Sequence, residues 1–276
     1  MTYVAALPMY DWPERRHEID AEWAEIRGRL RSAGIDAPQH LTRRNGDLPA
    51  VPGGIRDGDG NVIAPDPATL PQDRLDLPAL WRHPGLLLAQ TCWGPMELGL
   101  SRHVQVIGQP DYSGFEGGQG ESYSSVILMR AGNSEESISS PSDGRAIIPL
   151  DGLRDKRLAY NGEDSMSGII ALTRDLAAIG EDLSLFSEPI ETGGHRASMI
   201  AVAQGLADVC AADCRSWAMA QRFEPAAKLL QPVGWTRRRK GLPFITSINT
   251  PAPVVAALRS VLALADQRAI SPSSSG

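Results

Sequence analysis

Apolar residues occur along this chain in short runs that polar segments separate. The first run, Val4–Leu7, ends at Pro8 and predicts a strand. The next apolar positions recur at spacings of four, three and four, which is typical of an amphipathic helix: Ile19, Trp23, Ile26 and Leu30. Pro13 suits the first turn of this helix and Gly34 suits its end. A strand that leads into a helix through a short loop favours an α/β fold.

The same alternation of strands and helices continues along the chain. The expected strands are Leu86–Gln90, Val104–Ile107, Ser125–Met129, Arg157–Tyr160, Asp208–Ala212 and Leu242–Thr246. The expected helices are Gly168–Ile179, Ala197–Ala203 and Pro253–Ala265. Glycine and proline predict loops across Thr91–Pro95, Ser113–Gly120 and most of residues 43–79, and Ser271–Gly276 is expected to be a frayed tail. Two strand–helix series predict two α/β lobes, with the chain passing to the second lobe and returning.

Length and charge limit the class of protein. The chain has 276 residues, enough for about two domains. The formal net charge is −6, which argues against a protein that coats nucleic acid, because such binding depends on neutralising phosphates. No apolar run approaches the roughly 18 residues of a membrane-spanning helix. The opening residues lead directly into the first expected strand, so the sequence is either cytoplasmic or lacks its secretory leader.

Three features resemble known sites but are interpreted as structural. Cys92, Cys210 and Cys214 lack the spacing of a zinc site, so we expect reduced thiols and no metal; the last two would share a face only if their segment were helical. Asp57, Asp59 and Asn61 imitate a calcium loop, but Val62 replaces its glycine and Ala68 its glutamate, which favours a polar hairpin tip.

The basic run Thr236–Lys240 is the third of these features. It has no interleaved aromatic residues, and it lies where the chain is expected to return to the first lobe. We therefore interpret it as solvated charge beside that crossing, with a role for one arginine at the edge of a cleft as the alternative.

Candidate chemistry begins where the Arg157–Tyr160 strand leads into the next helix. Ser165, Ser167 and Gly168 open that helix, whose first turn offers N–H donors and a positive dipole end to an anion. The alternative is an ordinary helix cap. His195 follows two glycines at the start of another expected helix, with Ser198 three residues later on the same face, and it too has a structural alternative as a cap. Asp213 follows an apolar strand, at the sheet edge where α/β proteins bind ligands.

Taken in order, these segments resemble the phosphate/phosphonate-type substrate-binding proteins of ABC transporters. The pattern is a strand, SxSG and a helix, then GGHxxS and a helix, then GxxDVxAAD. Further matching segments are the opening strand ending in LPMY at 7–10, QTCWGP at 90–95, YSSVI at 123–127 and GLPFI at 241–245. The resemblance extends over nearly the whole chain.

The resemblance implies the type 2 periplasmic binding fold, which is transferrin-like. Each of its two lobes is a mixed sheet flanked by helices, and the ligand cleft lies between them. The crossings would lie near Val104–Tyr112 and Gln231–Lys240. Lobe 1 would then comprise residues 1–110 and 236–276, and lobe 2 residues 111–235.

The resemblance also implies the ligand-binding residues: Tyr10, Thr91, Trp93, Tyr123, Ser165, Ser167, Gly168, His195 and Asp213. Backbone N–H groups, hydroxyls and His195 would hold an oxyanion, while Asp213 would accept a hydrogen bond from a cationic or hydroxyl end of the ligand. Tyr10 and Trp93 would cover its apolar body. Phosphonate binders usually carry a hydroxyl residue where this chain has Met166, so one donor is missing.

The implied function is capture of a small anionic ligand by closure of the two lobes, with an ABC transporter permease as partner and no cofactor. The implied location is the periplasm, with the cytoplasm as the alternative because the sequence shows no signal peptide. The alternative functions are a ligand-sensing module and a cytosolic enzyme on the same fold, with His195 and Asp213 or Asp208 as acid–base groups. No nucleophile elbow, P-loop or dinucleotide fingerprint supports an enzyme.

Overall fold

The computed structural model describes residues 2–132 and 137–269, and the chain forms two compact units. Unit 1 comprises Met1–Pro110 and Leu242–Gly276, and unit 2 comprises Asp111–Gly241. Unit 2 is thus one continuous stretch of chain inserted into unit 1. The expected frayed tail, Ser271–Gly276, lies outside the described residues.

Unit 1 is built on a four-stranded mixed sheet in the order β1-β4-β14-β5. These strands are β1 (Val4–Ala6), β4 (Leu86–Gln90), β14 (Phe244–Ser247) and β5 (Val104–Gly108). β1 runs parallel to β4, whereas β14 runs antiparallel to both of its neighbours. The strands expected from the apolar runs are confirmed, and β14 comes from the end of the chain to lie between β4 and β5.

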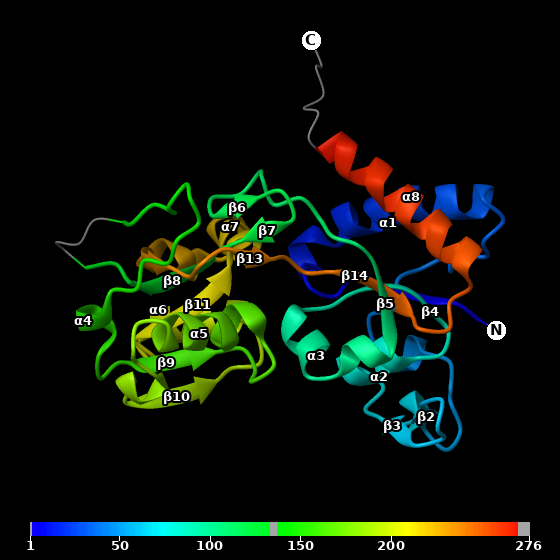
Figure 1. Cartoon of the computed structure of the whole chain (residues 1–276), viewed down its shortest axis with the longest axis horizontal. Coiled ribbons are helices and arrows are strands. Elements are labelled where there is room, and N and C mark those ends of the chain that lie inside the picture. Colours follow the sequence, from blue (N-terminus) through cyan, green and yellow to red (C-terminus); the bar gives the residue numbers. More distant parts are fainter. Residues whose placement is uncertain (1, 133–136, 270–276) are drawn as a thin grey trace, which may run out of the picture. The chain divides into compact units, whose positions relative to one another are not determined.

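Helices cover both faces of this sheet (Figure 1). On one face lie α1 (Arg16–Ser32) and α8 (Ala252–Ala269), and the predicted stripe of α1 is buried there. On the other face lie α2 (Leu77–Arg82) and α3 (Trp93–Glu97). The loop expected across Thr91–Pro95 is therefore wrong in part. Pro95 stands in the first turn of α3, where a helix needs no backbone N–H, so proline does not prevent the helix.

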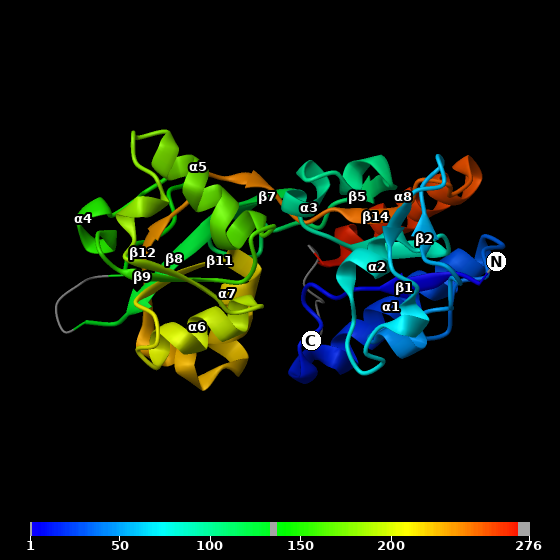
Figure 2. The ribbon, with the colours of Figure 1, turned by 90° about the horizontal axis from the view of Figure 1, so that it is seen from below.

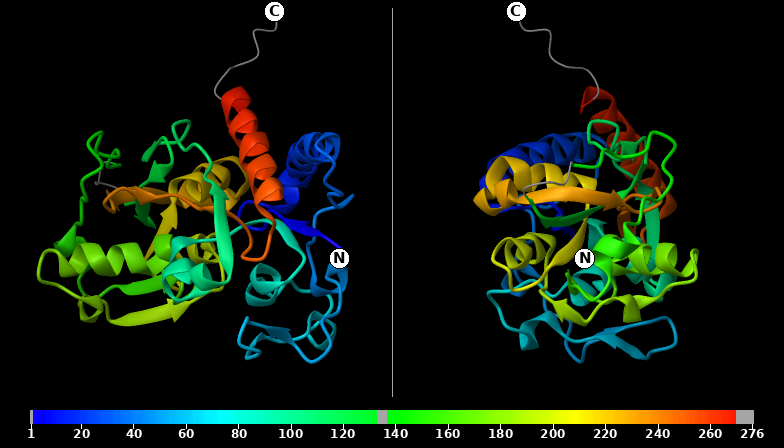
Figure 3. Two further views of the ribbon diagram at one scale, coloured as in Figure 1. Left: turned by 45° about the vertical axis from the view of Figure 1, so that its right-hand side comes forward. Right: turned by 90° about the vertical axis from the view of Figure 1, so that its left-hand side faces the viewer.

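A hairpin of β2 (Ile55–Arg56) and β3 (Val62–Ala64) lies against α2 (Figure 3). Asp57 Oδ1 accepts hydrogen bonds from the backbone N–H groups of Asp59 and Asn61, at 3.0 and 2.8 Å. This carboxylate therefore closes its own turn, as Asp commonly does. The polar hairpin tip expected at the calcium-like spacing is confirmed.

Unit 2 contains a five-stranded mixed sheet in the order β10-β9-β11-β8-β12. These strands are β10 (Glu188–Glu191), β9 (Arg157–Tyr160), β11 (Val209–Asp213), β8 (Ser125–Arg130) and β12 (Leu230–Trp235). β9 runs parallel to β10 and β11, whereas β8 runs antiparallel to β11 and β12. The two edge strands were not predicted. β10 has a glutamate at each end and contains Pro189, and β12 is interrupted by Pro232 and Gly234, where its register shifts.

Figure 2 shows α5 (Ala171–Ala177) on one face of this sheet, with α6 (His195–Ala203) and α7 (Cys214–Phe223) on the other. Leu172 and Leu176 of α5 pack on Leu158 and Val209 of the sheet, and the short helix α4 (Leu150–Leu153) adds Leu153 to the same cluster. α7 was not predicted; it begins immediately after β11, with Asp213 as its N-cap. Cys210 therefore lies on a strand and Cys214 at a helix start, so they share no helical face.

Residues 236–241 belong to unit 2, which corrects the predicted lobe boundary after residue 235. The Thr236 N–H donates to the Ser125 carbonyl at 2.9 Å. β13 (Arg239–Lys240) pairs with β7 (Ser122–Tyr123), which in turn pairs with β6 (Gly118–Gln119) in a small separate sheet. These pairings hold the returning chain on unit 2 until Gly241, because Gly241 N also donates to the Glu121 carbonyl.

The three cysteines are buried and are not joined in a disulfide. Burial raises the pKa of Cys210 to about 12 and also raises that of Cys214, so neither is a reactive thiolate near neutral pH. Among the described residues, no cluster of three or more His, Cys, Asp or Glu side chains has the arrangement of a metal site. No helix in this part of the chain has both the length and the apolar character of a membrane span.

Candidate functional site

The loop after β9 leads into a wide helical turn, Met166–Ile170, that continues as α5. Ser165 is the N-cap: its Oγ accepts a hydrogen bond from the Gly168 N–H at 3.0 Å. The turn is wider than an α-helical one because the Ile170 N–H reaches the Ser165 carbonyl, five residues back. The helix therefore begins two residues earlier than predicted, and the hydroxyl of Ser165 is already used as a cap.

Glycine is required at position 168 because the side chain of Asn161 lies against it. A Cβ at this position would collide with Oδ1 of Asn161, a buried oxygen that has no hydrogen-bond partner among the described residues. The absent side chain thus lets the loop residue Asn161 lie directly against the first turn of the helix.

We expect Gly168→Ala to lower the free energy of unfolding by about 1–3 kcal/mol, because overpacking displaces Asn161 or the turn. Denaturant-induced unfolding measures this change. Gly28→Ala is the matched control: Gly28 lies within α1 with open space around it, so alanine there should be neutral or stabilising. Equal stability of the Gly168→Ala variant and the wild type would contradict the predicted collision.

Three predicted residues meet at the carboxyl edge of the unit 2 sheet. Ser167 lies in the turn after β9, His195 is the first residue of α6, and Asp213 is the last residue of β11. Ser167 Oγ lies 2.8 Å from His195 Nε2, and Asp213 Oδ2 lies 3.5 Å from the same nitrogen. All three side chains are buried or nearly so.

The electrostatics of this group favour a neutral imidazole in the free protein. Burial lowers the pKa of His195 below its ordinary value, against the Asp213 carboxylate and the Ala211 carbonyl, which act to raise it. Asp213 Oδ1 accepts a hydrogen bond from the Ser216 N–H at 2.9 Å, so the carboxylate is held at the start of α7. A buried imidazole beside a fixed carboxylate would gain a proton when an anion approaches.

Ser198 does not join this group. Its hydroxyl lies 2.7 Å from the Thr192 hydroxyl and 3.3 Å from the Gly194 carbonyl, within the turn that starts α6. Ser198 therefore stabilises the segment that presents His195.

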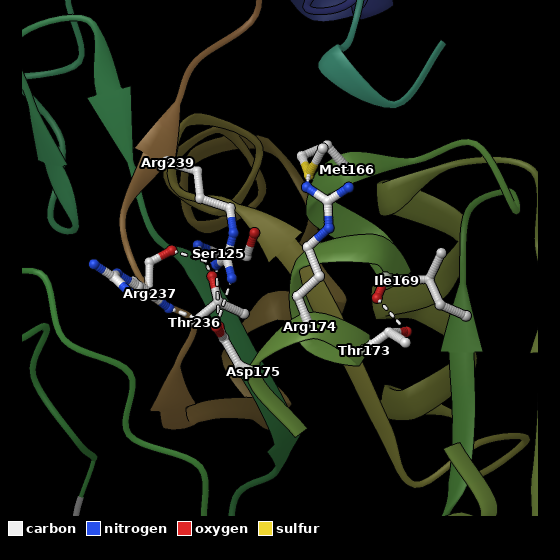
Figure 4. Close-up of polar contacts among 9 residues, drawn as sticks. All are labelled: Ser125, Met166, Ile169, Thr173, Arg174, Asp175, Thr236, Arg237 and Arg239. Atoms are coloured by element: carbon white, nitrogen blue, oxygen red, sulfur yellow. Dashed lines mark hydrogen bonds and ion pairs between the residues drawn. The ribbon is translucent and has the colours of Figure 1, made fainter. Parts of the chain in front are cut away.

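A buried carboxylate that sequence reasoning missed anchors the helix behind the site (Figure 4). Asp175 of α5 accepts hydrogen bonds from the Arg237 N–H at 2.7 Å and from the Arg239 guanidinium at 2.5 and 3.1 Å. The interpretation of the basic run as solvated charge is therefore wrong for Arg239, which is ion-paired to Asp175. No local pattern marks this pair, because 64 residues separate its partners.

Met166 stands where a hydroxyl residue was expected. Its side chain is buried, and its sulfur lies 3.9 Å from a guanidinium nitrogen of Arg174, as Figure 4 shows. Arg174 was not a predicted site residue. It brings a cation to the turn that carries Ser167.

The other predicted residues are Tyr123 of unit 2 and three residues of unit 1. Tyr123, on β7 of unit 2, is buried with its ring centroid 5.0 Å from that of Tyr112. In unit 1, Thr91 and Trp93 follow the carboxyl end of β4, and Tyr10 follows β1 but is only 1% exposed. Thr91 Oγ1 is buried without a hydrogen-bond partner in the described chain, so it has an unused hydrogen-bonding group.

Comparison with known proteins identifies relatives of this chain. Residues 96–271 match the family of periplasmic substrate-binding proteins of phosphonate ABC transporters. No match was found among curated proteins.

Two solved structures have similar folds. PhnD1 of Prochlorococcus marinus, in complex with methylphosphonate, has a TM-score of 0.61 at 16% identity, covering 94% of this chain and 82% of that one. XAC2383 of Xanthomonas citri, bound to chloride, has a TM-score of 0.60 at 15% identity, covering 98% and 85%. At these identities the likeness shows the fold, which is the α/β fold of periplasmic binding proteins with two lobes.

Proposed function

Because the chain belongs to the periplasmic substrate-binding protein family of phosphonate ABC transporters, we propose that it binds a small phosphate- or phosphonate-like oxyanion at Ser167, His195 and Asp213. The observation that supports this site is the contact of Ser167 Oγ and Asp213 Oδ2 with the same imidazole nitrogen. The hydroxyl and the N–H groups of the first helical turn donate to the oxyanion.

The imidazole supplies the positive charge. When the anion binds, His195 takes up a proton and donates a hydrogen bond, and Asp213 stabilises the imidazolium. Thr91 in unit 1, with its unused hydroxyl, and Tyr10, Trp93 and Tyr123 complete the set that the family resemblance assigns. Ser165 and Gly168 contribute by shaping the turn, since the Ser165 hydroxyl already accepts from the Gly168 N–H.

The same three residue types also form a catalytic triad in some hydrolases. In such a triad the serine faces one imidazole nitrogen and the carboxylate holds the other. Here Ser167 and Asp213 both lie at Nε2 of His195, so the carboxylate does not orient the imidazole to take a proton from serine. This arrangement supports a binding role without turnover.

Isothermal titration calorimetry with inorganic phosphate, methylphosphonate and sulfate tests the proposed function. We expect saturable binding of phosphate or methylphosphonate with 1:1 stoichiometry at the unit 2 site, and ³¹P NMR should show the ligand unchanged after incubation. The proposal fails if none of these anions binds. The partner we propose is an ABC permease, and the location is the periplasm.

We expect anion binding to consume a proton. The pKa of free His195 is lowered by burial, so the imidazole is mostly neutral near pH 7, and a bound anion raises its pKa. The affinity for the anion should be highest at pH values below the pKa of His195 in the free protein. It should fall as the pH rises from there toward the pKa of His195 in the complex. Titrations at pH 7 in buffers of different ionisation enthalpy measure the uptake. An affinity that rises with pH would contradict this role of His195.

A further inference from the structure

A second group of cationic side chains surrounds a cavity of about 500 Å³ within unit 1. Four parts of the chain line the cavity: the β2–β3 hairpin, the segment just before β4, the segment just before β5, and the residues at the end of β14. Its cationic or titratable basic residues are Arg56, Arg82, Arg102 and His103. None of the nine candidate ligand residues is among those that line it.

The cavity lies at the edge of the sheet opposite Thr91 and Trp93. β4 begins at this edge two residues after Pro84, β5 begins there directly after His103, and β14 ends there at Ser247. Thr91 and Trp93 instead follow the carboxyl end of β4. The cavity is therefore separate from the unit 1 residues assigned to the oxyanion.

The guanidinium groups at the cavity are not neutralised by the chain. Within residues 2–132 and 137–269, Arg56, Arg82 and Arg102 form no ion pair; Arg82 donates only to the Pro78 carbonyl, at 3.3 Å. Two carboxylates also line the cavity, those of Asp57 and Asp59. Asp57 is occupied by its own turn, and Asp59 is exposed at the hairpin tip. Arg56 and Arg102 are exposed, whereas Arg82 is half-buried, and a partly buried cation without a counter-ion is unfavourable.

The titration of the lining groups agrees with this geometry. Burial lowers the pKa of Arg82, against the charge of Asp76. Burial and the charge of Arg82 lower the pKa of His103, the Asp57 carboxylate raises it, and Arg102 lowers it further. Arg82 and Arg102 thus lie close enough to act on the His103 imidazole, with the Asp57 carboxylate acting against them.

We propose that this cavity binds a small organic phosphate, with the phosphate group between Arg82, Arg102 and His103. The planar fork of a guanidinium matches two oxygens of a phosphate, so arginines are suited to it. The rest of the lining is polar, with Ser247, Asn249 and Asp59 available to a hydroxyl-bearing body. The volume is within the range of small-molecule sites, about 300–1,000 Å³, and leaves room for more than one phosphate ion.

This proposal is tested by following the imidazole NMR signal of His103 in the full-length protein. The signal is assigned by its loss in the His103→Gln variant. Glycerol 3-phosphate, inorganic phosphate and uncharged glycerol are titrated in turn. We expect glycerol 3-phosphate to raise the pKa of His103 by about one unit. It should bind at least about 10-fold more tightly than inorganic phosphate. Uncharged glycerol should have no effect. Equal affinity for both phosphates would overturn the organic ligand, and an unmoved His103 signal would overturn the site.

Three variants separate this site from the one in unit 2. Arg102→Ala should weaken glycerol 3-phosphate about 10-fold and raise the pKa of free His103, because a repelling charge is removed. Arg82→Lys keeps the positive charge but loses the planar guanidinium that matches two phosphate oxygens, so it should also weaken the binding of glycerol 3-phosphate. Arg29→Ala, an arginine of α1 paired with Glu25, is the control and should change neither value. The His195 signal reports the unit 2 site in the same spectra, so phosphate that moves His195 alone overturns this proposal and leaves the proposed function intact.

Discussion

Replacing His195 with alanine is expected to weaken phosphate or methylphosphonate binding about 100-fold. The variant loses a charge-assisted hydrogen bond to the anion, and such a bond contributes about 1.5–3 kcal/mol. It also leaves Asp213, whose side chain is 3% exposed, without the imidazolium that would balance its charge beside the ligand. Ser167→Ala removes a neutral donor and should weaken binding about 10-fold. Calorimetry or equilibrium dialysis at pH 7 measures both affinities.

Ser198→Ala is the matched control for these variants. Ser198 is a buried hydroxyl on α6, about one helical turn after His195, but its hydroxyl bonds to Thr192. Its removal should leave affinity within about twofold. The double variant Ser167→Ala/His195→Ala should lose less than the product of the single losses, because the two side chains contact each other. Unchanged binding in the double variant would refute the site, though not the fold.

Replacing Asp175 with alanine is expected to lower the free energy of unfolding by about 3 kcal/mol. The carboxylate is 5% exposed and satisfies the Arg237 N–H and the Arg239 guanidinium together, so removing it leaves a partly buried cation and a backbone donor without partners. Asp175→Asn should recover part of the loss, because the amide oxygen still accepts the backbone hydrogen bond. Urea-induced unfolding followed by circular dichroism measures the change.

Asp143→Ala is the control for Asp175. Asp143 also pairs with an arginine, but both members of this pair are exposed, and such pairs contribute about 0–1 kcal/mol. The comparison separates the effect of a buried anchor from that of any lost ion pair. A cost at Asp175 no larger than that at Asp143 would show that the residues after Thr236 are held by their strand pairing alone.

Much of the fold follows from local pattern. The stripe from Ile19 to Leu30 predicts α1 because a helix places those positions on one face, and all four residues are buried in the structure. β10 and β12 were not predicted because each forms through pairing with the strand beside it. Pro232 is tolerated in β12 because β12 is an edge strand. α7 was not predicted because its apolar positions follow directly on those of β11, without a break in the pattern.

The meeting of three predicted residues was predictable because of their places at strand ends. Ser167, His195 and Asp213 each follow or end a strand, and a parallel sheet brings such positions to one edge. Asp175 and Arg239 were not predictable, because nothing in either local sequence indicates a partner 64 residues away. Tyr10 follows β1 and its side chain is 1% exposed in unit 1, a burial that the strand pattern did not indicate.

The position of β14 determines the order in which the chain is able to fold during synthesis. β1, β4 and β5 leave the ribosome first, but the strand that joins β4 to β5 is made only after all of unit 2. Unit 2 is contiguous and has its own core, so it is complete while unit 1 still lacks its central strand and α8. Until then β4, buried on both faces in the finished protein, presents an unpaired apolar edge. The half of the chain that is synthesised first is therefore the last to be complete, and it is the half most dependent on protection from aggregation.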